Sequence, residues 1–402
     1  MNKYLLFATL MFAGLSQVAY AQTRATRTSV MNGNATNPFT WDCTCIPVPG
    51  DNIIINHTVV LDADFGYTSG SVTINAAGAL NGDIPTRAFA YTGGSFTNNG
   101  IVNLGDFYHG GGTFSNTGLF TIQNAYAVDL TANTVNSGTF NVSDTLYINV
   151  NAIFTNSGTV NAPVIATAGT LTNMGTVNAT DIFNSGTLNN NGGPGFTMDN
   201  LYTSGNVINN AEMQIDFDLW NSETFTNDNL IVIDNNFWNG DTIAGTATFT
   251  NNGTISIAVD LNNSETMDGS GDYCVAGVSS NVGTVTGTLD VCDLSGTDFD
   301  NNFGTIAGTV TFCSAGSCAI GIAENALFEH TVYPNPFNSA VNFETKENGS
   351  YSLVVMNSIG ETVFTTSFTG NRYALDASAF TSGMYFYRLT GNTAIVSGTL
   401  VK

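Results

Sequence analysis

The feature that most constrains this chain is a short internal repeat of the form apolar-x-Asn-x-Gly. Its Asn and Gly pairs are Asn98 and Gly100, Asn116 and Gly118, Asn136 and Gly138, Asn156 and Gly158, Asn173 and Gly175, Asn184 and Gly186, and Asn251 and Gly253. A variant at Phe225 to Asn229 has asparagine in the glycine slot. Glycine and asparagine are the two residues that best tolerate positive φ, so the repeat predicts a tight bend.

The spacing of the repeat predicts a β-solenoid. The first six glycines, from Gly100 to Gly186, are 18, 20, 20, 17 and 11 residues apart. A period near 20 suits one coil, and the shared parity of the apolar, Asn and Gly positions puts apolar side chains on one face. Stacked coils would join their asparagines in amide ladders with a repeat of about 4.8 Å. Residues 50–315 then give roughly 13 coils.

A second architecture fits the same turn signals. Asn-x-Gly also begins β-hairpins, so an antiparallel sandwich is the alternative to the solenoid. The step of 11 residues between Gly175 and Gly186 fits hairpins better than coils. Both alternatives are all-β, as the abundance of β-branched and aromatic residues indicates.

The distribution of charge excludes several classes of partner. Charged residues make up only 10% of the chain, the net charge is −23, and no Lys or Arg occurs between Ala88 and Thr345. Binding to nucleic acid depends on several cationic contacts with phosphates, so nucleic acid is excluded as a partner of this region. Anionic polysaccharides and acidic membranes are disfavoured for the same reason. No segment is long and apolar enough for a transmembrane helix, which needs about 18 residues.

The N-terminus has the pattern of a secretory signal peptide over residues 1–21. Lys3 precedes an apolar run from Tyr4 to Phe12, and Ala19-Tyr20-Ala21 is a small-x-small cleavage site. We then expect a flexible leader at 22–40, the solenoid at 41–259, a cap or small β module at 260–318, and a linker at 319–330. Trp41 with the turn before Asn52 resembles the opening segment of bacterial β-helix proteins.

Six cysteines in an exported chain are expected to form disulfides. The candidates are Cys274, Cys292, Cys313 and Cys318. Cys274–Cys292 and Cys313–Cys318 are reasonable pairs, although four cysteines allow three pairings. Zinc is not expected, because the spacings do not fit a zinc module and no histidine lies near this cluster.

The last 72 residues, 331–402, contain short alternating segments punctuated by glycines, which predict a small Ig-like β-sandwich. Three motifs stand out, at 333–336, 355–360 and 382–389, and the chain ends in lysine. Together they resemble the type A C-terminal sorting domain of the type IX secretion system of Bacteroidota. The resemblance assigns the sorting signal to Pro334, Asn335, Pro336, Gly360, Gly383, Tyr385 and Lys402.

This resemblance also implies a route and a set of partners. The route is export by the Sec translocon, then passage through the type IX machinery and removal of the domain by a sorting protease. Attachment to surface lipopolysaccharide, or release, would follow. The expected location is therefore secreted or on the extracellular face of the outer membrane.

No catalytic constellation or cofactor site is expected. His57, His109 and His330 are far apart, and His109 is expected in a loop. Asp216 and Asp218 have the spacing that places two carboxylates on one face of a strand, as a glycosidase would need.

Three further features are weaker candidates. Trp220 and Trp238 could stack on sugars, although core or capping positions are the preferred interpretation. A structural Ca²⁺ could use the pairs Asp268/Asp272 and Asp298/Asp300, whereas the EF-hand-like segment from Asp260 lacks the required Gly and Glu. The triplets 144–146 and 241–243 match an Asp-Thr-apolar glycosylation motif of the same bacteria.

We therefore expect a non-enzymatic, adhesin-like or matrix-like surface rod. The alternative is a carbohydrate-active β-helix that hydrolyses or binds a neutral glycan. A flat Thr/Asn face used for ice binding or self-assembly is a third hypothesis. The ligand or receptor does not follow from the sequence.

Overall fold

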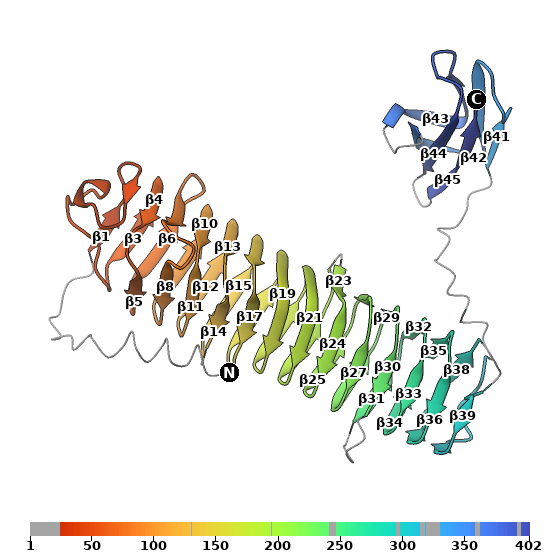
Figure 1. Ribbon diagram of the computed structural model, residues 1–402, viewed down its shortest axis with the longest axis horizontal. Helices are drawn as coiled ribbons and strands as arrows, with labels where there is room; N and C mark the ends of the chain where they lie inside the picture. The colour runs from red at the N-terminus through yellow and green to blue at the C-terminus, as the bar shows by residue number, and fades with distance from the viewer. Residues whose placement is uncertain are drawn as a thin grey trace. The chain divides into compact units, whose positions relative to one another are not determined.

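The computed structural model describes residues 25–129, 131–193, 195–240, 247–294, 298–313, 318, 330–357, 362–391 and 395–402. The chain divides into two units at Cys318. The first unit is a parallel β-solenoid and the second is an antiparallel sheet (Figure 1). The described residues include no helix of the length and apolar character that crossing a membrane requires.

Each coil of the solenoid contributes strands to three faces. Face 1 is a parallel sheet of 15 strands: β1 (Thr26–Thr28), β3 (Asn52–Ile55), β6 (Ser71–Ile74), β9 (Ser95–Asn98), β12 (Thr113–Asn116), β15 (Asn133–Asn136), β18 (Ile153–Asn156), β20 (Thr170–Asn173), β22 (Thr187–Asn190), β25 (Asn206–Asn209), β28 (Thr224–Asn227), β31 (Thr248–Asn251), β34 (Thr266–Gly269), β37 (Thr284–Val285) and β40 (Thr305–Ile306).

Faces 2 and 3 belong to one sheet of 25 strands. Face 2 contains β2 (Gly33–Asn34), β4 (Thr58–Leu61), β7 (Ala79–Gly82), β10 (Ile101–Leu104), β13 (Leu119–Ile122), β16 (Thr139–Val142), β23 (Gly195–Met198), β26 (Met213–Ile215), β29 (Leu230–Ile233), β32 (Thr254–Ile257), β35 (Asp272–Val275) and β38 (Asp290–Asp293). Face 3 contains β5 (Phe65–Tyr67), β8 (Ala88–Tyr91), β11 (Asp106–His109), β14 (Tyr126–Val128), β17 (Thr145–Ile148), β24 (Asn200–Thr203), β27 (Leu219–Asn221), β30 (Phe237–Asn239), β33 (Leu261–Asn263), β36 (Ser279–Asn281) and β39 (Asn301–Asn302). Two longer strands, β19 (Thr159–Thr167) and β21 (Thr176–Asn184), run across both faces and join them.

The solenoid prediction is confirmed. Successive coils pair in parallel register, as in Phe96, Phe114 and Thr134 on face 1, and the array has about 13 turns. Alternate side chains point inward and form one continuous apolar core. The antiparallel-sandwich alternative does not hold for the described coils, because every strand pair between them is parallel.

The expected amide ladder runs through the inside of the corner that follows face 1. Asn98 Nδ2 donates to Asn116 Oδ1 at 2.7 Å, and the same bond repeats from coil to coil. The ladder continues through Asn136, Asn156, Asn173, Asn190, Asn209, Asn227 and Asn251. These side chains are buried, so the ladder satisfies amides that would otherwise be unpaired.

The step of 11 residues has a simple cause. Asn184 lies on β21 of face 3, not on face 1, and its Nδ2 donates to Thr203 Oγ1 at 3.0 Å. A second ladder follows this corner and includes Asn221, Asn239, Asn263, Asn281 and Asn302. The interval from Gly175 to Gly186 therefore joins two different corners of one coil and is not a hairpin.

The reason for the repeat glycines differs from the expected one. None of Gly100, Gly118, Gly138, Gly158 and Gly175 is among the described glycines with positive φ. A Cβ on each of the last four would instead overlap the carbonyl oxygen of the glycine one coil below. Close approach between stacked backbones, rather than a left-handed bend, selects glycine there.

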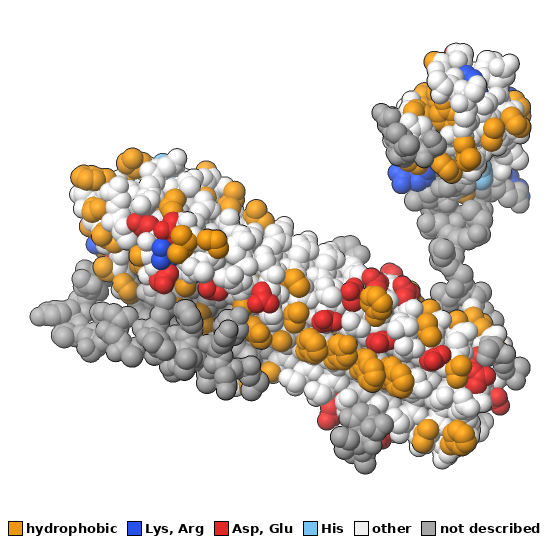
Figure 2. All heavy atoms as spheres, in the orientation of Figure 1, with side chains coloured by type: hydrophobic (Ala, Val, Ile, Leu, Met, Phe, Trp, Pro, Cys, Tyr) orange, Lys and Arg blue, Asp and Glu red, His pale blue; other side chains and the backbone are white. Residues whose placement is uncertain are grey.

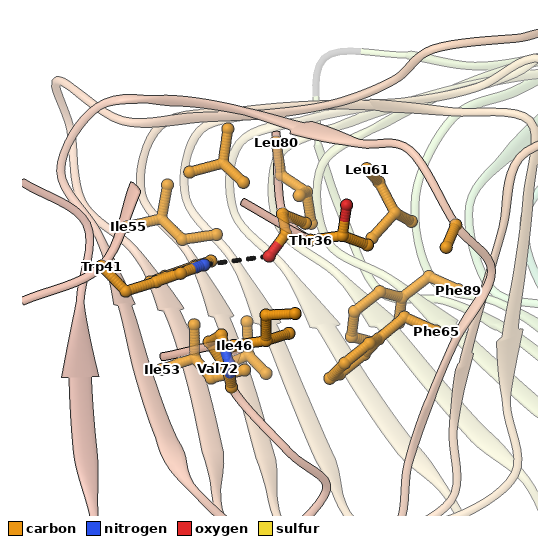
Figure 3. A pocket seen from close by; sticks show the side chains of 14 residues that line it. Thr36, Trp41, Ile46, Ile53, Ile55, Leu61, Phe65, Val72, Leu80 and Phe89 are labelled. Carbon is orange, nitrogen blue, oxygen red and sulfur yellow. Dashed lines mark hydrogen bonds between the residues drawn. The ribbon is translucent and has the colours of Figure 1, made fainter. Parts of the chain in front are cut away.

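The first coil begins earlier than predicted. Strand β1, within residues 22–40, pairs with β3, and η1 (Pro38–Thr40) lies in the same segment, so the described part of the expected flexible leader is folded. Trp41 enters the core and donates from Nε1 to the carbonyl of Ala35 at 2.9 Å. Beneath it lies an apolar cavity of about 50 Å³ that Ile46 and Phe65 help to line (Figure 3).

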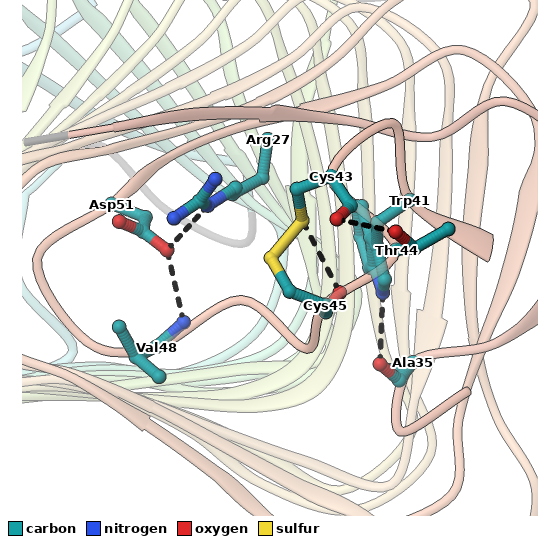
Figure 4. The surroundings of a disulfide bond; sticks show 8 residues. All are labelled: Arg27, Ala35, Trp41, Cys43, Thr44, Cys45, Val48 and Asp51. Atoms are coloured by element: carbon teal, nitrogen blue, oxygen red, sulfur yellow. Dashed lines mark hydrogen bonds and ion pairs between the residues drawn. A yellow bond between two sulfur atoms is a disulfide. The ribbon is translucent and has the colours of Figure 1, made fainter. Parts of the chain in front are cut away.

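A disulfide between two cysteines close in sequence, Cys43–Cys45, fixes the loop that covers this end (Figure 4). Beside it, Asp51 Oδ2 accepts from Arg27 Nε at 3.2 Å and from the Val48 amide at 3.2 Å. The first coil is thus closed by apolar packing, a cross-link and an ion pair.

The other end of the solenoid is closed by the late cysteines. They pair as Cys274–Cys318 and Cys292–Cys313, so the pairs favoured from the sequence are wrong. Thr311 pairs in parallel with Asp290 of β38, so the chain follows face 2 for one more coil before it reaches Cys313. Residues 260–306 continue the same three faces, so no boundary near residue 260 is seen.

The C-terminal unit is an antiparallel sheet with its own core. Its strands are β41 (His330–Tyr333), β42 (Ala340–Asn357), β43 (Thr362–Asp376), β44 (Met384–Thr390) and β45 (Ile395–Val401). The buried residues include Val341, Leu353, Leu389 and Leu400.

Candidate functional site

The outer surface of the solenoid has a hollow where faces 2 and 3 meet. Three residues separate the register-matched positions Asn141 and Thr145, but only two separate Asn161 from Val164 and Asn178 from Asp181. The coils that contain β19 and β21 are therefore one residue shorter at this corner than the coil that contains β16 and β17. The shorter corners leave a recess of about 430 Å³, which we call the corner hollow.

The corner hollow is lined by uncharged groups. Its lining consists of Asn141, Val142, Ser143, Asn161, Ala162, Pro163, Asn178, Ala179 and Thr180. Asn178 Nδ2 donates to Asn161 Oδ1, and Asn161 Nδ2 donates to Asn141 Oδ1, both at 2.8 Å. This outer amide ladder occupies one N–H and one lone pair of Asn161, so the second N–H and second lone pair can serve a ligand.

A column of aromatic side chains lies on face 3 next to the hollow. The register aligns Phe183, Tyr202, Trp220 and Trp238 on four successive coils. Figure 2 shows hydrophobic side chains in a diagonal row across these coils. Phe183 is 45% exposed and Trp220 is 37% exposed, so the preferred expectation of core or capping positions for the tryptophans is wrong for Trp220.

The rings of this aromatic column stack on one another. Adjacent centroids are 5.1, 6.4 and 4.9 Å apart, with interplanar angles of 8°, 21° and 11°. The faces of Tyr202 and Trp220 are thus covered by neighbouring rings, and ring edges face the solvent. Phe183 stacks on Tyr202 on one side, whereas the matching position in the preceding coil is the small Ala166. The ring face of Phe183 toward Ala166 is therefore more accessible than the stacked faces. Sugars contact aromatic side chains through such ring faces.

Carboxylates and amides alternate beside the aromatic column, two positions before each ring. Asn200 Nδ2 donates to Asp181 Oδ1 at 2.9 Å. Asp218 Oδ1 accepts from the Asn236 amide and side chain, both at 3.1 Å. Burial, Asp181 and Asp218 together raise the pKa of Tyr202, because each disfavours its phenolate.

Asp216 and Asp218 do not share a strand face. Both lie in the corner between β26 and β27, where Asp216 Oδ1 accepts from Gln214 Nε2 at 3.0 Å. Gln214 Nε2 also donates to Asp234 Oδ2 at 3.1 Å, which links two coils. The hydrogen bonds of these carboxylates give them a structural role in joining coils.

The three histidines occupy separate environments. His57 Nδ1 lies 2.9 Å from the carbonyl oxygen of Ser29, and His330 Nε2 lies 2.8 Å from the hydroxyl of Tyr387. His109 is on β11 and fully buried, so its expected loop position is wrong. Burial lowers the pKa of His109 to about 4, and its Nδ1 lies 3.0 Å from Thr134 Oγ1.

Two described carboxylates, Asp106 and Asp272, have the raised pKa that a general acid needs. Burial, with a smaller contribution from nearby Asp64, raises the pKa of Asp106 on β11. Arg87 lies beside this pair, 3.1 Å from Asp64 Oδ1 and 2.7 Å from Asp83 Oδ1.

Metal and modification sites receive little geometric support. The described residues contain no group of three or more His, Cys, Asp or Glu side chains that could hold a metal ion. Thr145 is 7% exposed and its Oγ1 donates to Asp144 Oδ1 at 3.1 Å, which leaves its hydroxyl poorly accessible to a glycosyltransferase. The second glycosylation motif, 241–243, lies outside the described residues.

The motif residues of the C-terminal unit converge on its last strand. Asn335, between the cis prolines Pro334 and Pro336, donates from Nδ2 to the Thr399 carbonyl at 2.8 Å and accepts from the Val401 amide at 2.8 Å. Lys402 Nζ donates to three main-chain carbonyls, of Ala377, Ser378 and Phe380, at 2.7, 3.0 and 2.6 Å.

Two more motif residues, Gly383 and Tyr385, lie at the same end of the sheet as the C-terminus. The main chains of Gly383 and Lys402 bond to each other at 3.0 and 3.1 Å. Buried Tyr385 donates its hydroxyl to the Thr381 carbonyl at 2.8 Å. Gly360 lies outside the described residues. The motifs therefore hold the C-terminus in place.

Comparison with known families gives a match over this unit. Residues 331–402 match the family described as the secretion system C-terminal sorting domain. This segment is a type IX secretion sorting domain. The sorting domain directs export to the cell surface or the extracellular space.

The solenoid has no comparable match. A comparison with curated proteins found no match to the chain. Among solved structures, the chain is similar to the cell-surface-expressed, multi-modular chitinase ChiW from Paenibacillus sp. str. FPU-7. The identity is 12% and the TM-score 0.15, over 88% of this chain and 24% of the chitinase chain, so the likeness carries no functional argument.

Sequence reasoning missed the aromatic column and the corner hollow. A signal for the column was present, because an aromatic residue precedes a ladder residue in Phe183-Asn184, Trp220-Asn221 and Trp238-Asn239. The hollow depends on a difference of one residue between coils. That difference is visible only after the coils are in register.

Proposed function

We propose that the mature protein is a non-enzymatic, adhesin-like rod displayed at or released from the cell surface. The sorting domain supports the route, and its removal followed by attachment to lipopolysaccharide is part of the proposal. The Sec translocon and the type IX machinery are the transient partners that this route requires.

The observation that carries the proposal is the repetition of one uncharged outer surface from coil to coil. On face 1, Thr170, Thr187, Thr224, Thr248 and Thr266 occupy the same outward column, interrupted by Asn206. A surface that repeats a weak contact many times suits adhesion, because multivalency raises avidity without any single strong site. An enzyme would instead need one specialised position.

The carboxylates near the aromatic column also support a structural role. Asp181 and Asp218 are hydrogen-bonded to amides of adjacent coils, and neither lies beside a second carboxylate with a raised pKa. These hydrogen bonds use both carboxylates to join adjacent coils.

The experiment is a paired assay of adhesion and hydrolysis. Beads coated with the purified mature chain are tested for retention on bacterial and host cell surfaces, and the soluble chain is tested for release of reducing sugar. We expect retention without product. Hydrolysis that disappears on substitution of a carboxylate would overturn the proposal.

A carbohydrate-active protein is the second candidate, and Asp106 is the observation that favours it. Its raised pKa and the proximity of Asp64 provide one acid and one base of the kind used in glycoside hydrolysis. This candidate predicts that Asp106→Asn abolishes sugar release. The matched control is Asp144→Asn, on an exposed corner of face 3.

A further inference from the structure

The corner hollow has the chemistry of a binding site for a neutral glycan. We propose that an extended, uncharged polysaccharide lies along the hollow and crosses β16, β19 and β21. This inference rests on the proposed adhesive function and names the class of partner that one site on the rod would take.

The polar lining is matched to hydroxyl groups. The outer ladder of Asn141, Asn161 and Asn178 presents one amide per coil, each with donor and acceptor capacity left over. A sugar hydroxyl both donates and accepts, so one amide can bind a hydroxyl in either sense. Thr180 adds an exposed hydroxyl at the edge of the hollow.

The apolar contacts lie on the C-terminal side of this ladder along each strand. They are the exposed Pro163 and the half-buried Ala179, which both line the hollow. Phe183, five residues beyond Asn178 along β21, lies outside the lining of the hollow. A pyranose has an apolar C–H face and polar edges, and this arrangement offers both kinds of contact.

Other classes of partner fit less well. The absence of Lys and Arg from Ala88 to Thr345 disfavours anionic polymers. An extended peptide would need a free strand edge, but β19 is paired on both sides, with β16 and β17 below and β21 above. A cationic polymer could be attracted by Asp144 and Asp181, and salt distinguishes that case.

The test is affinity electrophoresis of the full mature chain in gels that contain dextran, mannan or xyloglucan, with alginate and chitosan as charged comparisons. Thr180→Trp fills the hollow without removing a described hydrogen bond. Thr224→Trp is the matched control, because Thr224 is an equally exposed strand residue on face 1. Circular dichroism and thermal melting verify that both variants fold like the parent.

We expect at least one neutral glycan to retard the parent and Thr224→Trp, and to bind Thr180→Trp roughly tenfold more weakly. The retardation should persist at about 0.5 M salt, where exposed charge attraction is screened. Phe183→Ala and Trp238→Ala, both outside the lining of the hollow, should leave binding of the same glycan unchanged.

Four results would overturn the inference. One is equal glycan binding by Thr180→Trp and Thr224→Trp. Another is binding of chitosan alone that salt abolishes, which would indicate a cationic partner. The third is a folded chain that binds no neutral glycan yet still adheres to cells, which would leave the proposed function standing. If the folded chain neither adheres to cells nor binds a neutral glycan, the inference and the proposed function are both refuted.

Discussion

Asn136→Asp tests whether the internal amide ladder holds the coils together. Asn136 accepts from Asn116 at 2.7 Å and donates from Nδ2 to Asn156 Oδ1, the Thr159 carbonyl and the Gly138 carbonyl at 2.8, 3.0 and 3.2 Å. The substitution keeps the shape of the side chain but replaces this donor by a carboxylate oxygen. The new charge would face three acceptors at a fully buried position.

The expected cost is large and depends on pH. A buried charge without a compensating partner costs about 3–5 kcal/mol of unfolding free energy, and each orphaned acceptor adds to that. Burial raises the pKa of the introduced carboxyl above its usual 3.9 or so, so the deficit is full at neutral pH. It shrinks as pH falls through that raised pKa, because the neutral acid can donate again.

The assay is urea unfolding of the mature chain at several pH values, with hydrogen exchange to localise the weakened coils. Asn141→Asp is the control, since Asn141 lies in the outer ladder and is half-exposed. Its deficit should stay below about 1 kcal/mol, as for other surface substitutions. If Asn136→Asp costs no more than the control, or shows no pH dependence, the ladder does not stabilise the solenoid in this way.

Three further predictions concern other parts of the solenoid. Gly138→Ala should lower the urea midpoint, because the new Cβ would overlap the Gly118 carbonyl, whereas Gly66→Ala, where an added Cβ meets nothing, should not. His109→Val should make the free energy of unfolding less sensitive to acid. The unfolded histidine takes up a proton below about pH 6.5, whereas the buried one does so only near pH 4. The parent therefore loses up to about 3 kcal/mol of unfolding free energy between these pH values. Unchanged acid sensitivity would contradict this. Cys292→Ser should remove about 2–4 kcal/mol from the C-terminal coils and promote end-to-end association, measured by light scattering; a monomeric, equally stable variant would refute the capping role.

The solenoid and its amide ladder could be predicted because both are written into one repeat. Asn98, Asn116 and Asn136 recur with the period of a coil, and their parity fixes which side chains face inward. The reason for Gly118 was not predictable in the same way. Its neighbour is the backbone of the next coil, and no single coil contains that contact.

The remaining differences also arise between segments distant in sequence. Cys274 and Cys292 are register-matched on adjacent coils of face 2, and each pairs with a cysteine of the segment that follows β40. His109 is buried because side chains alternate between the two sides of β11. The three glycines that follow it had instead suggested a loop. The sorting motifs were recognisable one by one, but their common role in holding the last strand needed the sheet.

The pairing of each strand with the coils above and below gives the rod a definite response to force. The hydrogen bonds between coils lie along the axis of the solenoid, so a pull between its ends stretches the coil contacts in series. The coils would therefore come apart one at a time. Each coil of 17–24 residues would release about 60–80 Å of chain, while the other coils stay folded. A chain built in this way lengthens under load, so the tension between its ends stays low.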